Sequence, residues 1–173
     1  HIRTAGIHVG AHNEVAIPYI NDLGSDNQRQ RWLPGMVSGD IVGAIAMTEP
    51  GAGSDLQAIR ATAEDRGDHY LINGSKTFIT NGFLCDVVVV AAKTDPSKGA
   101  KGISLFIVDR DMAGFSKGVP FDKVGLHAQD TCELFFEDVK VPKENLLGNV
   151  GEGFKYLMTE LAQERLIVGL AAI

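Results

Sequence analysis

Apolar positions recur at helical spacing in the first forty residues. This spacing predicts one helix over residues 8–20, which Pro18 weakens near its end, and a second over residues 28–36. Residues 25–27 read Ser-Asp-Asn, which is typical of a helix N-cap, and Gly39 is typical of a helix end. The pattern therefore predicts a helical segment up to residue 40.

From Ile41 the apolar pattern becomes that of β-strands. Asn73-Gly74 predicts a hairpin turn, and Asn81-Gly82 predicts a second turn. Because the short strands follow one another without a helical pattern between them, we expect an antiparallel barrel or sandwich and no parallel βαβ units. The predicted strands cover residues 41–47, 59–64, 70–72, 77–80, 87–92, 103–108, 119–124 and 132–141.

Helical spacing returns near the end of the chain. Leu157, Leu161, Glu164 and Val168 lie about a turn apart and predict a helix over residues 154–173. The chain starts without an initiator methionine and stops inside this helical pattern, so we interpret it as an internal piece of a longer protein. The whole pattern predicts an α+β chain in three parts. These are a helix pair over residues 1–40, an antiparallel β-barrel or sandwich domain over residues 41–148 and the start of a helical domain over residues 149–173.

Composition narrows the class of protein. The chain is 45% hydrophobic, which excludes wholesale disorder. Its 16 basic and 22 acidic side chains give a net charge of −6, and no run of Lys and Arg favours nucleic-acid binding. The longest uncharged apolar run, residues 41–48, is too short to cross a bilayer. Cys85 and Cys132 make no disulfide framework, and without a signal-peptide pattern we expect a reducing compartment and no secretion.

The most unusual stretch is a loop of small residues at 48–55, with the sequence Thr-Glu-Pro-Gly-Ala-Gly-Ser-Asp. Glycines let backbone N–H groups approach a ligand closely, and the hydroxyls of Thr48 and Ser54 can donate to a flat heterocycle or a phosphate. An ordinary loop at a strand end is the alternative. The loop is not a dinucleotide fingerprint, because Leu56 stands at the third glycine position and no βαβ unit surrounds it.

Two further stretches carry candidate chemistry. Phe78 and Thr80 are two apart on a predicted strand and share a face, where an aromatic ring can cover a flavin and a hydroxyl can bond its edge. The alternative is a hairpin strand with one buried Phe. Glu164 lies on an otherwise apolar helix and is a candidate general base if burial raises its pKa, whereas periodicity alone favours a surface carboxylate.

Together these stretches resemble the acyl-CoA dehydrogenase family of flavoproteins. Five stretches match family motifs in order and spacing, at residues 47–55, 74–82, 125–131, 135–139 and 142–148. The resemblance therefore covers essentially the whole chain. Within the family, the chain resembles the long-chain type. The resemblance implies that residues 1–40 are the end of an N-terminal helical domain, that residues 41–148 are a middle antiparallel β-barrel or sandwich domain, and that residues 149–173 are the first helix of a C-terminal helical domain. It also implies FAD as cofactor, with Phe78 where many relatives carry Trp. The residues it implies at the flavin are Ile45, Ala46, Met47, Thr48, Glu49, Pro50, Gly51, Ala52, Gly53, Ser54, Phe78, Ile79 and Thr80.

The resemblance also implies the reaction, which is α,β-dehydrogenation of an acyl-CoA thioester in fatty-acid β-oxidation. Glu164, immediately before Arg165, stands where the long-chain and isovaleryl subgroup carries its base, and would remove the α-proton while the β-hydrogen leaves as hydride to flavin N5. Donors to the thioester oxygen would stabilise the enolate. The residues implied at the substrate are Ser54, Thr94, Ala162, Gln163 and Arg165.

Partners and rivals follow from the same resemblance. It implies an electron-transfer flavoprotein as electron acceptor, a homo-oligomer (dimer or tetramer) at full length, and a bacterial cytoplasm or mitochondrial matrix as location. We expect the isolated piece to be inactive, because the rest of the C-terminal helical domain would complete the pocket. An acyl-CoA oxidase or another flavin-dependent oxidase or monooxygenase on the same scaffold is the main alternative, and a degenerate, non-catalytic binding module is another.

Three other motifs could indicate a serine nucleophile, a metal site or a glycosylation site, and each has weaker support. Ser116 lies in a Gly-x-Ser-x-Gly sequence, but a nucleophile elbow needs a strand, a turn and a helix, and here a strand pattern continues. His8 and His12 have metal-ligand spacing without an evident third ligand. Asn73 begins a glycosylation sequon that the predicted hairpin explains.

Overall fold

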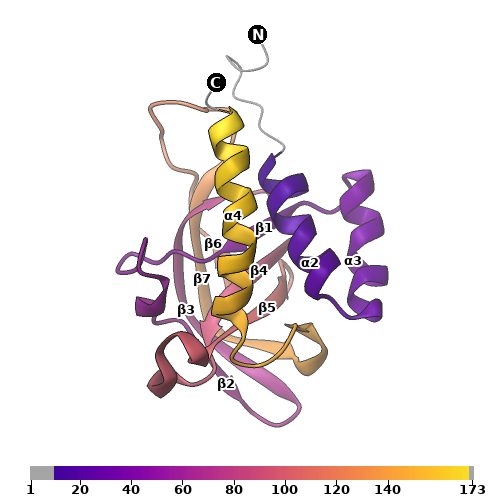
Figure 1. Cartoon of the computed structure of the whole chain (residues 1–173), viewed down its shortest axis with the longest axis vertical. Coiled ribbons are helices and arrows are strands. Elements are labelled where there is room, and N and C mark those ends of the chain that lie inside the picture. Colours follow the sequence, from indigo (N-terminus) through magenta and orange to yellow (C-terminus); the bar gives the residue numbers. More distant parts are fainter. Residues whose placement is uncertain (1–9, 172–173) are drawn as a thin grey trace.

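The computed structural model describes residues 10–171. The chain forms a helical segment, a β-sheet and a final helix, in the order that the sequence predicts (Figure 1). The division into three domains stays a prediction. The helices are η1 (Ala11–Ala16, a π-helix), α2 (Ile17–Leu23), α3 (Asp26–Ser38) and α4 (Gly153–Ala171), with short 3₁₀ turns η2 (Leu56–Ala58), η3 (Pro96–Gly102) and η4 (Lys143–Asn145). The strands are β1 (Gly43–Ala46), β2 (Thr62–Asp65), β3 (His69–Thr80), β4 (Val87–Lys93), β5 (Ile103–Asp109), β6 (Phe115–Lys117), β7 (Thr131–Pro142) and β8 (Leu146–Leu147).

Local capping chemistry sets the bounds of α3. The Ser25 hydroxyl accepts the Gln28 backbone N–H, and the Gln28 side chain accepts the Ser25 N–H, which completes a capping box. Gly39 then takes a left-handed conformation at the C-terminus. Both predicted helix signals are confirmed. The beginning of the first predicted helix at residues 8–9, and residues 172–173 of the last, lie outside the described residues.

The sheet is mixed. Its strand order is β6-β7-β3-β2-β4-β5-β8, and β1 pairs with β4 off this path. The neighbours β6·β7, β7·β3, β3·β2, β4·β5 and β5·β8 are antiparallel, as predicted. In contrast, β1 runs parallel to β4 along four residue pairs, and β2 meets β4 in parallel at one pair. The 48–61 loop and the β2–β3 hairpin lie between β1 and β4 in the chain, so this parallel pairing needs no crossover helix.

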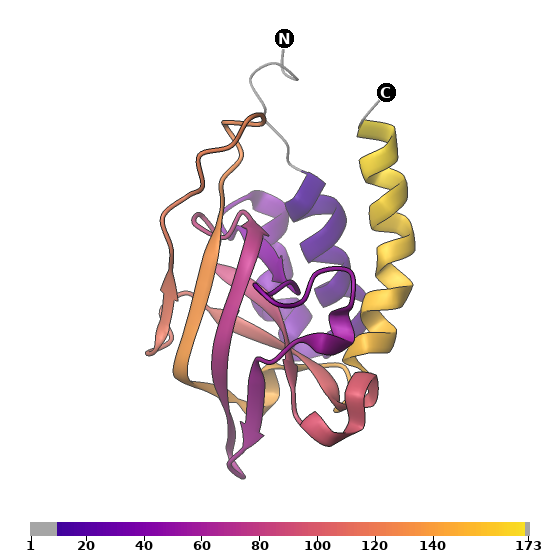
Figure 2. The same ribbon diagram turned by 90° about the vertical axis from the view of Figure 1, so that its left-hand side faces the viewer.

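Strand β4 separates two hydrophobic cores. Val88, Val90 and Ala92 pack into the core of the sheet, whereas the alternate residues of this strand pack under the helices. Strand β5 is shared in the same way, with Phe106 on one side and Ile107 on the other. Figure 2 shows the consequence, with α2, α3 and α4 gathered on one side of the sheet.

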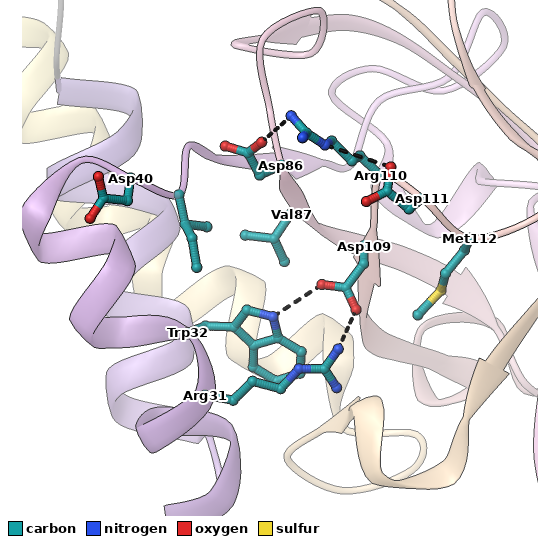
Figure 3. A pocket seen from close by; sticks show the side chains of 10 residues that line it. Arg31, Trp32, Asp40, Asp86, Val87, Asp109, Arg110, Asp111 and Met112 are labelled. Carbon is teal, nitrogen blue, oxygen red and sulfur yellow. Dashed lines mark hydrogen bonds and ion pairs between the residues drawn. The ribbon is translucent and has the colours of Figure 1, made fainter.

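Side-chain bonds from α3 fasten this helix to the end of β5. Asp109, at the end of β5, accepts from Arg31 at 2.7 Å and from the Trp32 indole N–H at 3.1 Å (Figure 3). Next to it, Arg110 donates to Asp86 at 2.5 Å. These groups line a polar cavity that shares no residue with the candidate site described below.

The hairpin predicted at Asn73-Gly74 is wrong. Strand β3 runs straight through these residues, and the turn lies earlier, where the Arg66 N–H bonds the His69 carbonyl. Gly74 instead has a φ of +144° and lies so close to the residue just before β2 that a Cβ would sit 2.7 Å from the Ala61 Cβ. The Asn73 side chain spans a bulge in β7 by exchanging two hydrogen bonds of 2.9 Å with Asp138, so Asn-Gly serves the bulge and not a turn.

The strand predicted over residues 119–124 is also wrong. Strand β6 ends at Lys117, and the following residues have no regular structure. Val119 and Val124 are exposed, so the apolar alternation there does not mark a buried face. Pro120 lacks an N–H, and in place of a regular ladder the chain around it makes single backbone bonds to β7, from the Gly118 N–H to the Glu133 carbonyl and from the Phe121 N–H to the Thr131 carbonyl. The second predicted turn, at Asn81-Gly82, is confirmed, and Cys85 and Cys132 are buried free thiols. Within residues 10–171 no helix has the length and apolarity that a bilayer span requires.

Gly74→Ala is expected to lower the free energy of unfolding by about 2–4 kcal/mol, because it combines a positive φ with a steric clash. Chemical denaturation measures this loss. Gly125→Ala is the matched control, since its φ is not positive and nothing lies within 4 Å of its Cβ position. Equal unfolding midpoints for the two variants would contradict the close approach of Gly74 to Ala61.

Candidate functional site

A cavity of about 540 Å³ opens between the helices and the end of β3. It collects residues from η1, β1, β3, the loop before β7 and α4. Most of its wall is apolar, and the polar side chains in it are those of Thr48, Thr80, Gln129 and Glu164. An apolar cavity with a few converging polar groups is the usual form of a small-molecule site. Its lining is Gly10, Ala11, Val15, Ile45, Met47, Thr48, Phe78, Ile79, Thr80, Leu126, Gln129, Glu164, Ile167 and Val168.

Backbone pairing joins the two loop segments that the sequence singled out. The Thr77 N–H donates to the Thr48 carbonyl at 3.0 Å, and the Thr48 hydroxyl donates to the Thr77 carbonyl at 2.5 Å. The 48–55 loop and the end of β3 are therefore adjacent at the cavity. The single hydroxyl proton of Thr48 is engaged in this contact, so Thr48 offers a ligand its oxygen as an acceptor and not a donor.

A bulge in β3 turns Phe78 toward the cavity. Lys76 pairs with Leu134 and Ile79 with Cys132, so β3 has one residue more than β7 over this stretch. Phe78 absorbs the extra residue with a φ of +57°, an uncommon conformation for a bulky side chain. Phe78 is 70% exposed, and the centre of its ring lies 5.5 Å from the centre of the Phe121 ring. An aromatic face is thus available to a ligand.

A buried ion pair holds the loop against β3. The Lys76 ammonium is fully buried, 2.8 Å from Glu49 Oε1 and 3.0 Å from the Met47 carbonyl. The Glu49 carboxylate also accepts the backbone N–H groups of Arg60 at 2.6 Å and Ala61 at 3.0 Å. Burial lowers the pKa of Lys76, and the neighbouring carboxylate opposes that shift. The Glu49 carboxylate is therefore engaged by groups of the protein itself, and it lines neither this cavity nor the smaller one described below.

Glu164 lies on the packed face of α4. It follows Leu157 and Leu161 at helical spacing and is partly buried, so the surface-carboxylate alternative does not hold. Its Oε1 accepts the Tyr19 hydroxyl at 3.1 Å. Burial is the main cause that raises the pKa of Glu164. The Tyr19 hydrogen bond opposes this rise, the negative charge of Glu160 adds to it, and Arg165 lowers it.

A second cavity of about 290 Å³ adjoins the first. The two share Met47 and Thr48, and the second adds Ser54 from the loop and Arg165 from α4. The remaining wall includes the apolar side chains of Phe154, Met158 and Leu161. Ser54 and Arg165, expected at the substrate, are thus brought together at one cavity.

Other residues expected at the site lie elsewhere. Ala46 and Ala52 are buried in the cores, and Pro50 and Gly51 form an exposed turn. Thr94 bonds the Gly102 carbonyl at 3.1 Å and the Ser104 hydroxyl at 2.9 Å. None of these residues, nor the exposed Ala162 and Gln163, lines either cavity.

The sequence analysis missed several lining residues. Ala11 and Val15 come from η1, and Leu126 and Gln129 come from an irregular loop, so only tertiary packing brings them here. Gln129 Oε1 is buried and accepts no hydrogen bond within the described part of the chain. Ile167 was detectable, because it lies three positions after Glu164 on the same helix face.

The rival chemistries find little support. Ser116 lies in the middle of β6, opposite Phe135, and no helix follows it. A nucleophile elbow is therefore absent around this serine. The His12 ring bonds the Gly43 N–H and the Met36 carbonyl, each at 2.9 Å, so backbone groups engage both nitrogens. His8 lies outside the described residues.

Comparison with known families agrees with this geometry. Residues 44–139 match the acyl-CoA dehydrogenase middle domain, and residues 2–40 match the N-terminal domain of the same family. The chain belongs to the acyl-CoA dehydrogenase family. The middle-domain match contains the 48–55 loop, all of β3 and Gln129.

Individual relatives are similar over nearly the whole chain. The mitochondrial long-chain specific acyl-CoA dehydrogenase of Sus scrofa is 52% identical over 94% of this chain and 38% of its own length. An acyl-CoA dehydrogenase structure from Geobacillus kaustophilus is 57% identical, with a TM-score of 0.93, over 95% of this chain and 44% of that one. A structure described as the electron transferring flavoprotein of Acidaminococcus fermentans is 46% identical, with a TM-score of 0.92, over 95% of this chain and 43% of that one. The chain thus spans about two fifths of the length of these relatives.

The cavity residues fit the flavin that this family carries. An isoalloxazine is a flat, largely apolar ring system with a polar edge, and the Phe78 ring with Ile45 and Ile79 offers an apolar surface for it. The unpaired Gln129 Oε1 is an acceptor for a ring N–H. Thr80 and the Thr48 oxygen supply further polar atoms on the same wall.

Lys76→Met is expected to lower the free energy of unfolding by about 3–5 kcal/mol, because it leaves the Glu49 carboxylate buried without its cation. Chemical denaturation provides the measurement. Lys98→Met is the matched control, since it removes an exposed ion pair with Asp95, worth less than about 1 kcal/mol. If Lys76→Met cost no more than the control, the buried pair would not be what holds the loop.

Proposed function

We propose that this chain forms part of an FAD-dependent acyl-CoA dehydrogenase that oxidises acyl-CoA thioesters at the α,β-bond. The observation that carries the proposal is that Glu164 and the aromatic wall at Phe78 line one apolar cavity. A base and a flat-ring surface on a shared cavity is the arrangement that such a reaction requires. The family membership supports the same reaction class.

In the proposed mechanism Glu164 removes the α-proton of the thioester. When bound, FAD supplies the acceptor for the hydride that leaves the β-carbon. Phe78, Ile79 and Ile45 orient the ring system by packing and exclude water from the reacting carbons. We extend the proposal to the residues expected around the flavin, at 45–54 and 78–80.

The environment of Glu164 suits a base for a weak carbon acid. Burial raises its pKa, which makes the carboxylate more basic than an exposed glutamate. The base acts in its ionised form, so flavin reduction should rise with pH through this raised pKa and then level off.

The second cavity is the proposed position of the thioester and the adjoining part of CoA. Ser54 can donate a hydrogen bond there, and Arg165 supplies a positive charge. Thr94, Ala162 and Gln163 remain part of the proposal as substrate contacts that segments outside this chain would complete. The rest of the whole protein would close the pocket.

The proposal includes partners and location. An electron-transfer flavoprotein is the proposed electron acceptor, supported by the likeness to the Acidaminococcus fermentans structure. We further propose a homo-oligomer, dimeric or tetrameric, in a bacterial cytoplasm or a mitochondrial matrix, as the mitochondrial origin of the Sus scrofa relative supports.

Glu164→Gln is expected to slow flavin reduction by acyl-CoA about 10²–10⁴-fold, because the amide cannot accept the α-proton. Stopped-flow bleaching of the flavin band measures this rate, in a protein of the relatives' length that carries this chain, with acyl-CoAs of graded length. Glu160→Gln removes a carboxylate one turn earlier on α4 and should stay within a few-fold of the parent.

Equal bleaching of Glu164→Gln and the parent would overturn the assignment of the base. The same preparation separates a dehydrogenase from an oxidase, since the reduced flavin of a dehydrogenase passes its electrons to electron-transfer flavoprotein faster than to oxygen. Rapid reoxidation by oxygen alone would favour the oxidase alternative.

Phe78→Ala is expected to weaken FAD binding about tenfold, because it removes the exposed aromatic wall of the cavity. Titration of the apoprotein with FAD, followed by flavin fluorescence, gives the dissociation constant. Phe83→Ala is the control, since Phe83 is partly exposed but lines neither cavity. A matching loss in both variants would show that Phe78 has no specific contact with the flavin.

A further inference from the structure

Tyr19 reaches the site from a part of the chain that the proposed mechanism does not use. It lies on α2, has no exposed surface, and its hydroxyl donates to Glu164 Oε1 at 3.1 Å across 145 positions of sequence. We propose that Tyr19 is the positioning residue of Glu164, which fixes one carboxylate oxygen so that Oε2 is presented to the substrate. This inference rests on the proposed function, in which Glu164 is the base.

The helix geometry explains why Tyr19 can reach α4. Pro18 has no N–H to bond the carbonyl four residues earlier, and its ring crowds that carbonyl. The chain forms the π-helix η1 up to Ala16 and becomes α-helical at Ile17, with Pro18 in the first turn of α2. A π-helical turn rotates the residues that follow it, and such turns are frequent at functional sites. Tyr19 is the first residue after this proline.

The packing makes the contact rigid. Tyr19 belongs to the core under the helices, together with Trp32, Met36 and Leu157 of α4. A phenol held in this way loses little further freedom when it binds a carboxylate, whereas Glu164 has three rotatable bonds to restrain. In Figure 1, α2 lies beside α4, which agrees with this contact.

The charges around the pair favour a phenol that keeps its proton. Burial and the nearby Glu164 raise the pKa of Tyr19, so the hydroxyl stays a donor wherever Glu164 is ionised. Glu160 and Arg165 act on Glu164 from α4 with opposite signs, and Asp22 of α2 acts on Glu160. Among the described residues that line the cavity, Glu164 alone carries a formal charge.

Tyr19→Phe is the decisive variant, because it keeps the buried ring and removes the hydrogen bond. Loss of a donor to the carboxylate should raise the pKa of Glu164 by about one unit. The pH profile of flavin reduction should move upward by the same amount. At a pH above both pKa values, the reduction rate should fall several-fold, because the carboxylate is no longer oriented.

Two controls fix the sign of the effect. Tyr156→Phe removes a tyrosine–glutamate bond of 2.7 Å to Glu152 near the start of the same helix, outside the first cavity, and should leave the profile unchanged. Glu160→Gln removes a repelling charge and should lower the pKa of Glu164.

A readout without flavin or substrate tests the bond itself. Infrared titration of the apoprotein follows the protonated carboxyl band, and subtraction of the Glu164→Gln spectrum isolates the band of Glu164. The ¹³Cζ resonance of labelled Tyr19 should also move in Glu164→Gln, which examines the bond without altering the tyrosine.

The outcomes separate the two proposals. In one outcome Tyr19→Phe changes neither the pKa of Glu164 nor the pH profile of flavin reduction, while Glu164→Gln still reduces its flavin slowly. This outcome would overturn the positioning role of Tyr19 and leave the proposed function intact. A raised carboxyl pKa in Tyr19→Phe with normal bleaching by Glu164→Gln would overturn the assignment of Glu164 as the base and with it the positioning role of Tyr19, whereas the proposed dehydrogenation would stand.

Discussion

One extra residue in β3 determines the shape of the candidate site. Between Lys76 and Ile79 this strand takes three steps where β7 takes two, so Phe78 adopts a positive φ and turns its ring outward. The same bulge lets the Thr77 backbone bond Thr48 instead of β7. Such a conformation costs about 1–3 kcal/mol and persists only where the surroundings impose it. Here the buried Lys76–Glu49 pair and the ladders on both sides impose it.

The rest of the site depends on the bulged end of β3 being held rigidly with respect to the helices. Strand β4 contributes to both cores, so the helices and the rest of the sheet pack against opposite faces of the same strand. Strand β1, which carries Ile45, pairs with β4 and contacts both η1 and β3. As a result, a carboxylate on α4 and an aromatic ring on β3 have a fixed relation although 86 positions of sequence, from 78 to 164, separate them.

Local patterns predicted the parts of the fold that local chemistry decides. The cap at Ser25, the buried strands β4, β5 and β7, and α4 follow from periodicity and end signals. Asn73-Gly74 misled because the same dipeptide that permits a turn also permits a close approach between strands. The family motifs indicated both loop segments and Glu164, whereas the contributions of Tyr19 and Gln129 arise from packing between distant segments, which no local pattern records.

Two requirements conflict at Glu164 in its proposed role as the base, and the structure meets both. A base for a weakly acidic C–H bond needs an apolar cavity, yet the same cavity favours the neutral acid, which is useless as a base. Burial and Glu160 push the pKa upward, while Tyr19 and Arg165 push it downward. Because Tyr19 is neutral, its hydrogen bond stabilises the carboxylate without placing a positive charge beside it, which would lower the basicity of the carboxylate further. A hydrogen bond from a buried phenol is therefore the milder of the two ways to keep this carboxylate ionised, and the one that also fixes its direction.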